Sequence, residues 1–145
     1  MIVAELTHSS IVITADAASL MDIIADVEAY GEWISGIDEV TVEGAAADGR
    51  PVEATFVGNL GLVKGAYSVA YDWAATEVSW HLTEAEMLKD LQGTYRCTDL
   101  GDGTTQVEYY LSVELSIPVV GMLRRRGEKI IIDSALKGLK RRAEH

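Results

Sequence analysis

The sequence predicts an α+β fold in which a curved antiparallel sheet of seven strands encloses one long C-terminal helix. Between residues 37 and 115, apolar and polar residues alternate in short runs separated by turn residues, which is typical of an antiparallel meander. Beyond residue 116 the apolar residues recur at helical spacing to about residue 143. Because the chain has 145 residues, we expect one domain over residues 1–145 with one hydrophobic core.

One strand and two short helices are expected before the meander. Residues 6–13 alternate as a strand, and Asp16 then offers a carboxylate that can cap a helix over residues 17–25. Residues 26–33 predict a second short helix, in which two aromatic side chains three positions apart share a face.

The meander and the last helix have clear signals. Asp102-Gly103 predicts a tight hairpin before the final strand, where alternate residues from position 107 to 115 face one side. Pro118 suits the first turn of the last helix. The six strands are expected at residues 40–43, 52–57, 63–73, 77–83, 91–98 and 105–115. The predicted apolar stripe of the last helix consists of Met122, Leu123, Gly127, Ile130, Ile131, Ala135, Gly138 and Leu139.

Charge is distributed unevenly along the chain. Residues 1–123 carry four basic side chains against twenty acidic ones, a net charge of −16, whereas residues 124–145 carry eight against three, a net charge of +5. An acidic body repels phosphate backbones, so we expect no nucleic acid partner. No apolar run reaches the roughly 18 residues of a membrane span, and no export signal is expected at the N-terminus, so we expect no integral membrane contact. A single cysteine, Cys97, fits a cytoplasmic location.

Several motifs together resemble one known superfamily. They are residues 11–15 before the first helix, residues 26–33 after it, Trp80 with Gly93 and Tyr95, and residues 102–104 before the last strand. With the element order, they make nearly the whole chain resemble the START-like (SRPBCC) superfamily, specifically its polyketide cyclase/dehydrase and coenzyme Q-binding-like branch. The resemblance implies a helix-grip fold of the START and Bet v 1 type. It also implies a cavity between sheet and helix for a hydrophobic molecule such as a lipid, a quinone or an aromatic polyketide.

The apolar faces of the predicted strands agree with such a cavity. If these faces point at the helix, aromatic and aliphatic side chains converge on one interior, with tyrosine hydroxyls as the few polar groups. For any single one of these side chains, packing in the core is the competing interpretation. The expected cavity residues are Trp33, Tyr71, Trp73, Trp80, Leu82, Tyr95, Tyr109, Leu111, Val113, Ile130 and Ile131.

No catalytic or metal-binding set stands out. The three histidines, His8, His81 and His145, lack the spacing of metal ligands, so neither a metal nor a cofactor is expected. The lone cysteine falls on an apolar strand face and is expected to be an inert buried thiol. Only Glu84 and Glu86 are expected in a loop that could overhang a cavity mouth.

Three functions therefore remain open. The first is binding or transport of a hydrophobic small molecule. The second is a polyketide cyclase or dehydratase-like reaction in the same cavity, where tyrosines such as Tyr71, Tyr95 and Tyr109 orient carbonyl groups. The third is a protein-interaction module that uses the basic C-terminal helix or the apolar hairpin at residues 59–63.

The run Arg124, Arg125 and Arg126 lies near the start of the last helix. The helix dipole favours cations at the other end, so it does not account for this run. We expect it to make at most a weak contact with an anionic lipid surface or an acidic partner.

Overall fold

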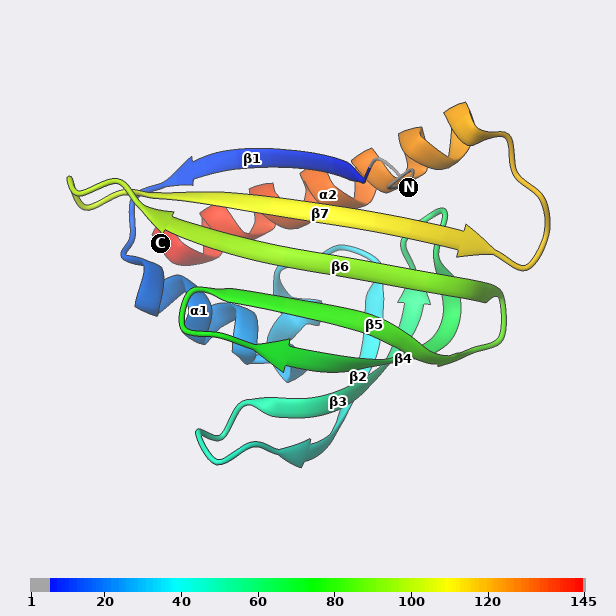
Figure 1. The fold of residues 1–145 in the computed structure, drawn as a ribbon, viewed down its shortest axis with the longest axis horizontal. Helices are drawn as coiled ribbons and strands as arrows, with labels where there is room; N and C mark the ends of the chain where they lie inside the picture. The colour runs from blue at the N-terminus through cyan, green and yellow to red at the C-terminus, as the bar shows by residue number, and fades with distance from the viewer. Residues whose placement is uncertain (1–5, 145) are drawn as a thin grey trace, which may run out of the picture.

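The computed structural model describes residues 6–144 of the chain (Figure 1). Residues 1–5, where the sequence predicts no export signal, and His145 lie outside the described residues. The elements are β1 (Thr7–Ile13), α1 (Ala17–Ala25), the 3₁₀ helix η1 (Val27–Glu32), β2 (Ile37–Ala45), β3 (Pro51–Asn59), β4 (Lys64–Trp73), β5 (Glu77–Ala85), β6 (Leu88–Asp99), β7 (Thr105–Leu115) and α2 (Gly121–Glu144). The predicted element order is confirmed, and the strand ends move by a few residues only.

All seven strands form one antiparallel sheet in the order β1-β7-β6-β5-β4-β3-β2. Strands β2 to β7 pair with their neighbours in the chain, and β1 returns to pair with β7, so that Thr7 lies opposite Leu111. The register shifts in the β2–β3, β4–β5 and β6–β7 pairs, and such bulges bend a strand and increase its twist. Figure 1 shows the β2–β4 end of the sheet turned away from the β1–β7 end, which confirms the predicted curved sheet.

The two short helices, α1 and η1, pack together and position the Tyr30 ring. The side chain of Asp16 accepts a hydrogen bond of 2.8 Å from the backbone N–H of Ser19, as the predicted cap requires. Helix α1 buries one face, and the hydroxyl of Tyr30 in η1 donates a hydrogen bond to the carbonyl of Ile24 in α1. This bond holds the Tyr30 ring on the inner side of the sheet.

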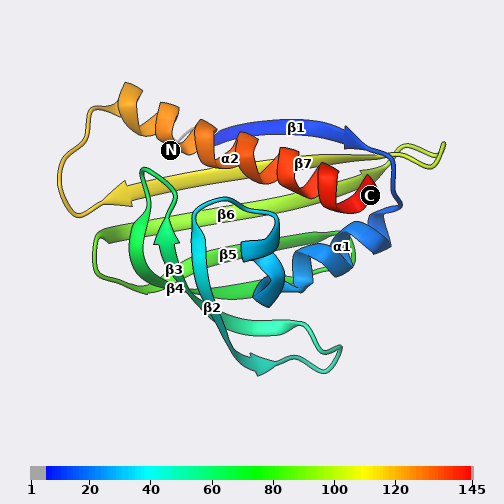
Figure 2. The ribbon, with the colours of Figure 1, turned by 180° about the vertical axis from the view of Figure 1, so that it is seen from behind.

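Helix α2 packs on β1 and β7, as Figure 2 shows, and leaves the rest of the concave face to other residues. At Gly138 it approaches the chain so closely that an added Cβ would lie 2.2 Å from the backbone oxygen of Trp33. Only glycine permits this contact, because real Cβ atoms do not come so near a backbone atom. The buried apolar residues of α2 are Ile131, Ile132, Ala135, Leu136 and Leu139.

The predicted apolar stripe of α2 is correct in the second half of the helix and wrong in the first. Met122 is 65% exposed, Leu123 is 55% exposed and Ile130 is 60% exposed. At 100° per residue these three positions lie outside the buried arc of the helix, which is centred on Glu128, Ala135 and Leu139. The sequence therefore contains two apolar stripes on α2, and only one of them is buried.

A buried carboxylate joins α2 to the sheet. The side chain of Glu128 is only 3% exposed and accepts hydrogen bonds from the hydroxyl of Thr7 at 2.6 Å and from the backbone N–H of Val113 at 2.7 Å. Both oxygens are thus partnered, and the bonds reach β1 and β7 from one helical position. The sequence gives no sign of this contact, because a glutamate in a helix is usually exposed.

No helix among residues 6–144 is long and apolar enough to cross a membrane.

We expect Glu128→Ala to lower the free energy of unfolding by about 1–3 kcal/mol, because the N–H of Val113 is left buried without a partner. Urea denaturation measures the loss. The exposed strand residue Glu43, which lies opposite Glu53 and whose side chain makes no hydrogen bond among residues 6–144, provides the control, since Glu43→Ala should not lower stability. Equal stability of the two variants would contradict the proposed link between helix and sheet.

Candidate functional site

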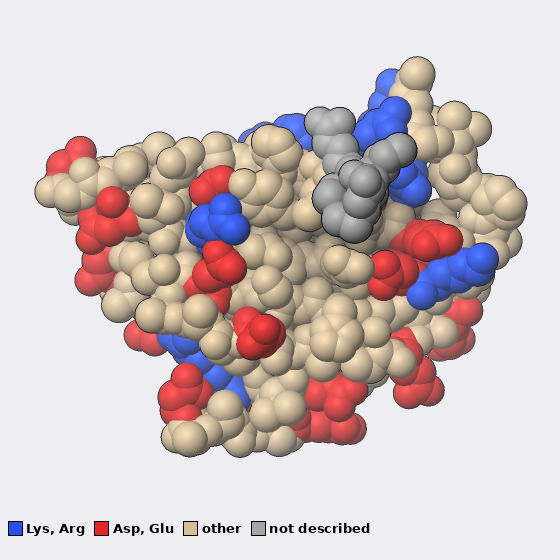
Figure 3. All heavy atoms as spheres, viewed as in Figure 1, with Lys and Arg blue, Asp and Glu red and all other residues tan. Residues whose placement is uncertain are grey.

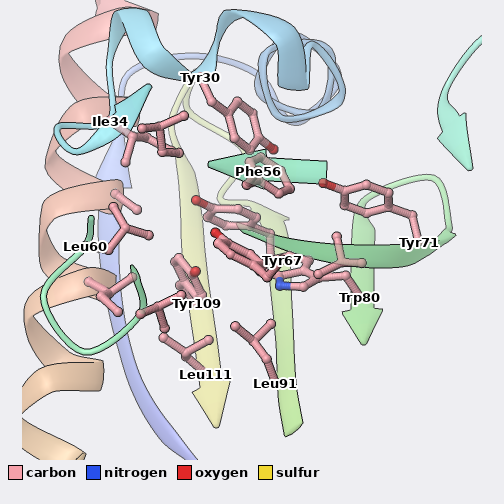
Figure 4. A pocket seen from close by; sticks show the side chains of 16 residues that line it. Tyr30, Ile34, Phe56, Leu60, Tyr67, Tyr71, Trp80, Leu91, Tyr109 and Leu111 are labelled. Carbon is pink, nitrogen blue, oxygen red and sulfur yellow. The ribbon is translucent and has the colours of Figure 1, made fainter. Parts of the chain in front are cut away.

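The concave face of the sheet and α2 enclose a recess whose wall is almost entirely hydrocarbon and aromatic ring. It lies over strands β3 to β7 and is bounded on the far side by α2 and two connecting segments (Figure 4). No charged side chain lines it among the residues that the structure describes. The lining residues are Tyr30, Ile34, Ile37, Phe56, Leu60, Val63, Tyr67, Val69, Tyr71, Trp80, Leu91, Tyr95, Tyr109, Leu111, Ile131 and Ala135.

The strand pairing explains why Trp80 is part of this wall. Trp80 on β5 lies opposite Gly93 on β6, and a Cβ at position 93 would come within 2.2 Å of the indole ring. The ring therefore lies flat over the neighbouring strand, in space that any larger residue at position 93 would fill. It meets the Tyr95 ring at 5.4 Å and the Tyr109 ring at 5.7 Å between centroids.

A second aromatic series covers the other side of the recess. The ring of Tyr30 is stacked with that of Phe56 at 6.1 Å, and Phe56 is stacked with Tyr67 at 5.3 Å. Rings at these spacings gain a modest attraction beyond the area they bury. Two groups of rings thus face the same space: tilted and edge-on rings from β5 to β7, and stacked rings from η1, β3 and β4.

Four phenol groups supply the polarity of the recess. The hydroxyls of Tyr67, Tyr71, Tyr95 and Tyr109 make no hydrogen bond to another residue among 6–144, and none is fully buried, so each can reach solvent or a ligand through the recess. Figure 4 shows the phenols of Tyr67, Tyr71 and Tyr109 pointing in toward the middle of the recess. Desolvation raises the pKa of all four well above its ordinary value, and the neighbouring phenols raise the pKa of Tyr71, Tyr95 and Tyr109 further. They stay protonated at neutral pH and can donate hydrogen bonds.

The recess is narrow in this conformation. The space open to the centre of a water molecule is about 60 Å³, whereas the whole recess, including its part open to solvent, spans about 610 Å³. Sites for drug-sized ligands usually measure about 300–1,000 Å³, so a ligand of several rings requires the wall to move. The β3–β4 loop is a part of the wall held in neither sheet nor helix, and we expect it to move. It contributes Leu60 and Val63, and Gly61 within it and Gly65, the second residue of β4, have φ of +89° and +88°.

The structure brings six of the predicted cavity residues together around this recess. They come from four strands and the last helix, and all six are at least half-buried. They are Tyr71, Trp80, Tyr95, Tyr109, Leu111 and Ile131.

The other five predicted residues lie elsewhere. Trp33 packs against α2 at Gly138, and Val113 is buried in the core beside Glu128. Leu82 is half-buried next to the β4–β5 bulge without lining the recess. Ile130 points outward, because it is on the exposed side of α2.

Trp73, the last of these five, closes the end of β4. Its indole N–H donates a 2.7 Å hydrogen bond to the carbonyl of Pro51, and the Arg50 guanidinium lies 5.2 Å from the ring centre. Its ring stacks on Tyr71 at 5.3 Å and supports that residue from behind. Trp73 thus does not line the recess but packs against Tyr71, which does.

Ten lining residues were not predicted. Tyr67 and Val69 could have been found, because they are in phase with Tyr71 on β4. Val63 could also have been found, because it begins the predicted strand at residues 63–73 in the same phase, whereas Ile34 and Leu60 could not, since they lie in connecting segments whose path no periodicity describes. The hairpin at residues 59–63, a candidate contact surface in the sequence, instead turns Leu60 and Val63 inward.

The remaining chemical candidates lie outside the recess. Glu84 and Glu86 are exposed near the β5–β6 turn and do not line it, and His8 and His81 are exposed on the convex face. Cys97 is buried, and desolvation raises its pKa to about 11, so the thiol stays protonated as predicted.

The family model for polyketide cyclase/dehydrase and lipid transport matches residues 5–144, nearly the whole chain. The chain belongs to this family. The resemblance seen in the sequence is thereby confirmed. No curated protein sequence matches it significantly.

Solved structures show the same fold at low identity to this member of the family. A START superfamily protein from Mycobacterium smegmatis is 21% identical with a TM-score of 0.89, over 96% of this chain and 97% of that one. The Zhui aromatase/cyclase from Streptomyces sp. R1128 is 11% identical with a TM-score of 0.79, over 97% of this chain and 93% of that one. A protein from Thermus thermophilus, TTHA0849, is 20% identical with a TM-score of 0.78, over 97% of both chains.

The buried phenols predict a delayed tyrosine titration. In the native protein Tyr110, on the convex face, should form tyrosinate before the other five tyrosines, although its hydrogen bond to Glu108 raises its pKa too. The raised native pKa values mean that the unfolded chain ionises first, so stability is intact below about pH 10 and falls above it. Ultraviolet titration with and without denaturant measures this. Several native phenols ionising near pH 10 would show that the recess is wet.

Trp80→Ala should cost about 2–3 kcal/mol, below the roughly 3–5 usual for a core tryptophan, because the half-buried ring faces free space on one side. Chemical denaturation measures this cost. A loss of about 5 kcal/mol or more would show that the ring is ordinary core.

Proposed function

We propose that the protein binds a hydrophobic, uncharged, oxygen-bearing aromatic molecule, such as a quinone or an aromatic polyketide, in the recess between the sheet and α2. The observation that carries the proposal is the chemistry of the wall: sixteen lining residues without a charge, among them four phenol hydroxyls that make no hydrogen bond to another residue of the described chain. Stacked rings and a few fixed donors are what such a molecule requires. The name of one structural relative, the Zhui aromatase/cyclase, agrees with an aromatic ligand.

The same wall argues against a fatty acid or another anion as the bound molecule. An ionised carboxylate in the recess would lose its hydration without gaining a cationic partner, since the lining offers neither lysine nor arginine. A carbonyl oxygen, in contrast, can accept a hydrogen bond from a phenol, so that both groups have a partner inside the recess. Among the three ligand classes open to the sequence, the quinone and the polyketide are therefore favoured over a charged lipid.

A cyclase or dehydratase-like reaction is the second candidate, favoured by the phenols alone. Protonated tyrosines can polarise a carbonyl and stabilise an enolate oxygen as it forms. Removing a proton from carbon needs a base as well, and the recess presents no group that titrates near neutral pH. Binding is therefore the function that the geometry supports best.

Thermal shift with naphthoquinone, anthraquinone and palmitate tests the proposal. The two quinones should raise the melting temperature in proportion to the logarithm of their concentration, and palmitate should not. Native mass spectrometry of the purified protein gives a second readout, a bound neutral molecule. No shift with any quinone, together with no bound molecule, would overturn the proposed binding.

The double variant Tyr67→Phe/Tyr109→Phe keeps both rings and removes two donors. We expect naphthoquinone to bind roughly 10- to 30-fold more weakly, because two hydrogen bonds of about 1 kcal/mol each are lost. Titration by fluorescence quenching measures the affinity. Tyr110→Phe, on the convex face, is the matched control and should bind as the wild type does. If both variants bind equally well, the phenols do not contact the ligand.

A further inference from the structure

Large apolar side chains are exposed at the start of α2 and in the segment before the helix. Ile117 is 63% exposed, Val120 68%, Met122 65% and Leu123 55%. Further along the helix, Ile130 is 60% exposed. Single exposed apolar residues are common, but five large ones gathered on one projecting segment are not needed for the fold and indicate a surface that something covers. We call these five residues the apolar stripe of the helix start.

Two exposed arginines follow Met122 and Leu123 in the first turns of α2. Arg125 and Arg126 are both exposed, and neither forms an ion pair among residues 6–144, whereas Lys129, Lys140 and Arg142 further along α2 are paired with acidic residues. Figure 3 shows Lys and Arg gathered where the helix projects from the body, with Asp and Glu spread over the sheet below. Arg124 does not belong to this set. It is half-buried against the loop before the helix, with an unpartnered Nε.

We propose that the helix start docks on the surface of a membrane that contains anionic lipid, with the apolar stripe in the interface and Arg125 and Arg126 at the headgroups. Large apolar side chains with arginine beside them are the composition of helices that lie in this interface. The rest of the chain sets the orientation. Residues 1–123 carry a net charge of −16, so an anionic surface repels the sheet, and among the exposed basic side chains of α2 without an ion pair in residues 6–144, Arg125 and Arg126 are the ones next to the apolar stripe.

The docking surface adjoins the recess. An added Cβ on Gly127 would lie 2.9 Å from the side chain of Leu62, so the β3–β4 loop rests on α2 between Leu123 and Ile130. That loop also supplies Leu60 and Val63 to the recess wall. A membrane that takes up the apolar stripe thus lies next to the movable wall, where a hydrophobic ligand could pass from lipid to recess. This last step rests on the proposed binding function, whereas the docking itself does not.

Co-sedimentation with lipid vesicles at low salt tests the docking. The full chain should bind vesicles of phosphatidylcholine mixed with phosphatidylglycerol at least about tenfold more tightly than vesicles of phosphatidylcholine alone, and added salt should weaken the binding. Arg125→Gln/Arg126→Gln should lose about tenfold or more, as each arginine near the surface contributes appreciably. Met122→Ser/Leu123→Ser should also lose about tenfold, because its apolar side chains no longer enter the interface.

Two controls make the result specific. Lys137→Gln/Arg141→Gln removes two exposed charges from the distal half of the same helix and should bind as the wild type does. The recess variant Tyr67→Phe/Tyr109→Phe should also keep full vesicle binding, which separates failure of the docking from failure of ligand binding. All substituted α2 positions are exposed, and circular dichroism checks that each variant is folded.

The proposal is overturned by any of three outcomes. If the wild type does not sediment with anionic vesicles, the proposed docking is excluded. It is also excluded if Lys137→Gln/Arg141→Gln loses as much vesicle binding as Arg125→Gln/Arg126→Gln. A concentration-dependent dimer in light scattering that Met122→Ser/Leu123→Ser abolishes, without vesicle binding, would show that a second copy of the chain covers the stripe instead.

Discussion

The position of α2 against one half of the sheet is the constraint on which the recess depends. Glu128 ties the helix to β1 and β7 through two hydrogen bonds, and Gly138 lets its distal half touch the backbone at Trp33. A helix fixed in this way cannot also cover β3 to β6. Those strands are covered by their own aromatic side chains and by a loop, which pack less completely than a helix and leave free space.

The interior that results is apolar but not inert. A wall made only of aliphatic side chains would have no means of orienting a guest, whereas phenol hydroxyls that face the recess supply directional donors. Burial raises the pKa of these phenols, so their protonation does not vary over the physiological range of pH. The same arrangement that suits a neutral oxygen-bearing ligand thus disfavours an anionic one.

The fold could be predicted from the sequence almost completely, because strand alternation and a capped helix are local signals. The recess could be predicted only in part. Tyr95 and Tyr109 follow from strand phase, but Leu60 depends on the path of a loop. On α2 the sequence holds two apolar stripes and does not say which is buried. Glu128 decides this, because its two bonds turn Ile131 inward and Ile130 outward, and its burial has no local signal at all.

Tyrosine-specific NMR tests the central claim most directly. With the tyrosine rings isotopically labelled, all six residues give separate signals, and one of them, Tyr110, reports on the convex face. Addition of naphthoquinone should shift the signals of Tyr67, Tyr71, Tyr95 and Tyr109 and leave that of Tyr110 in place. Saturable binding that shifts only Tyr110, or none of the six, would mean that the space between sheet and helix does not receive the ligand.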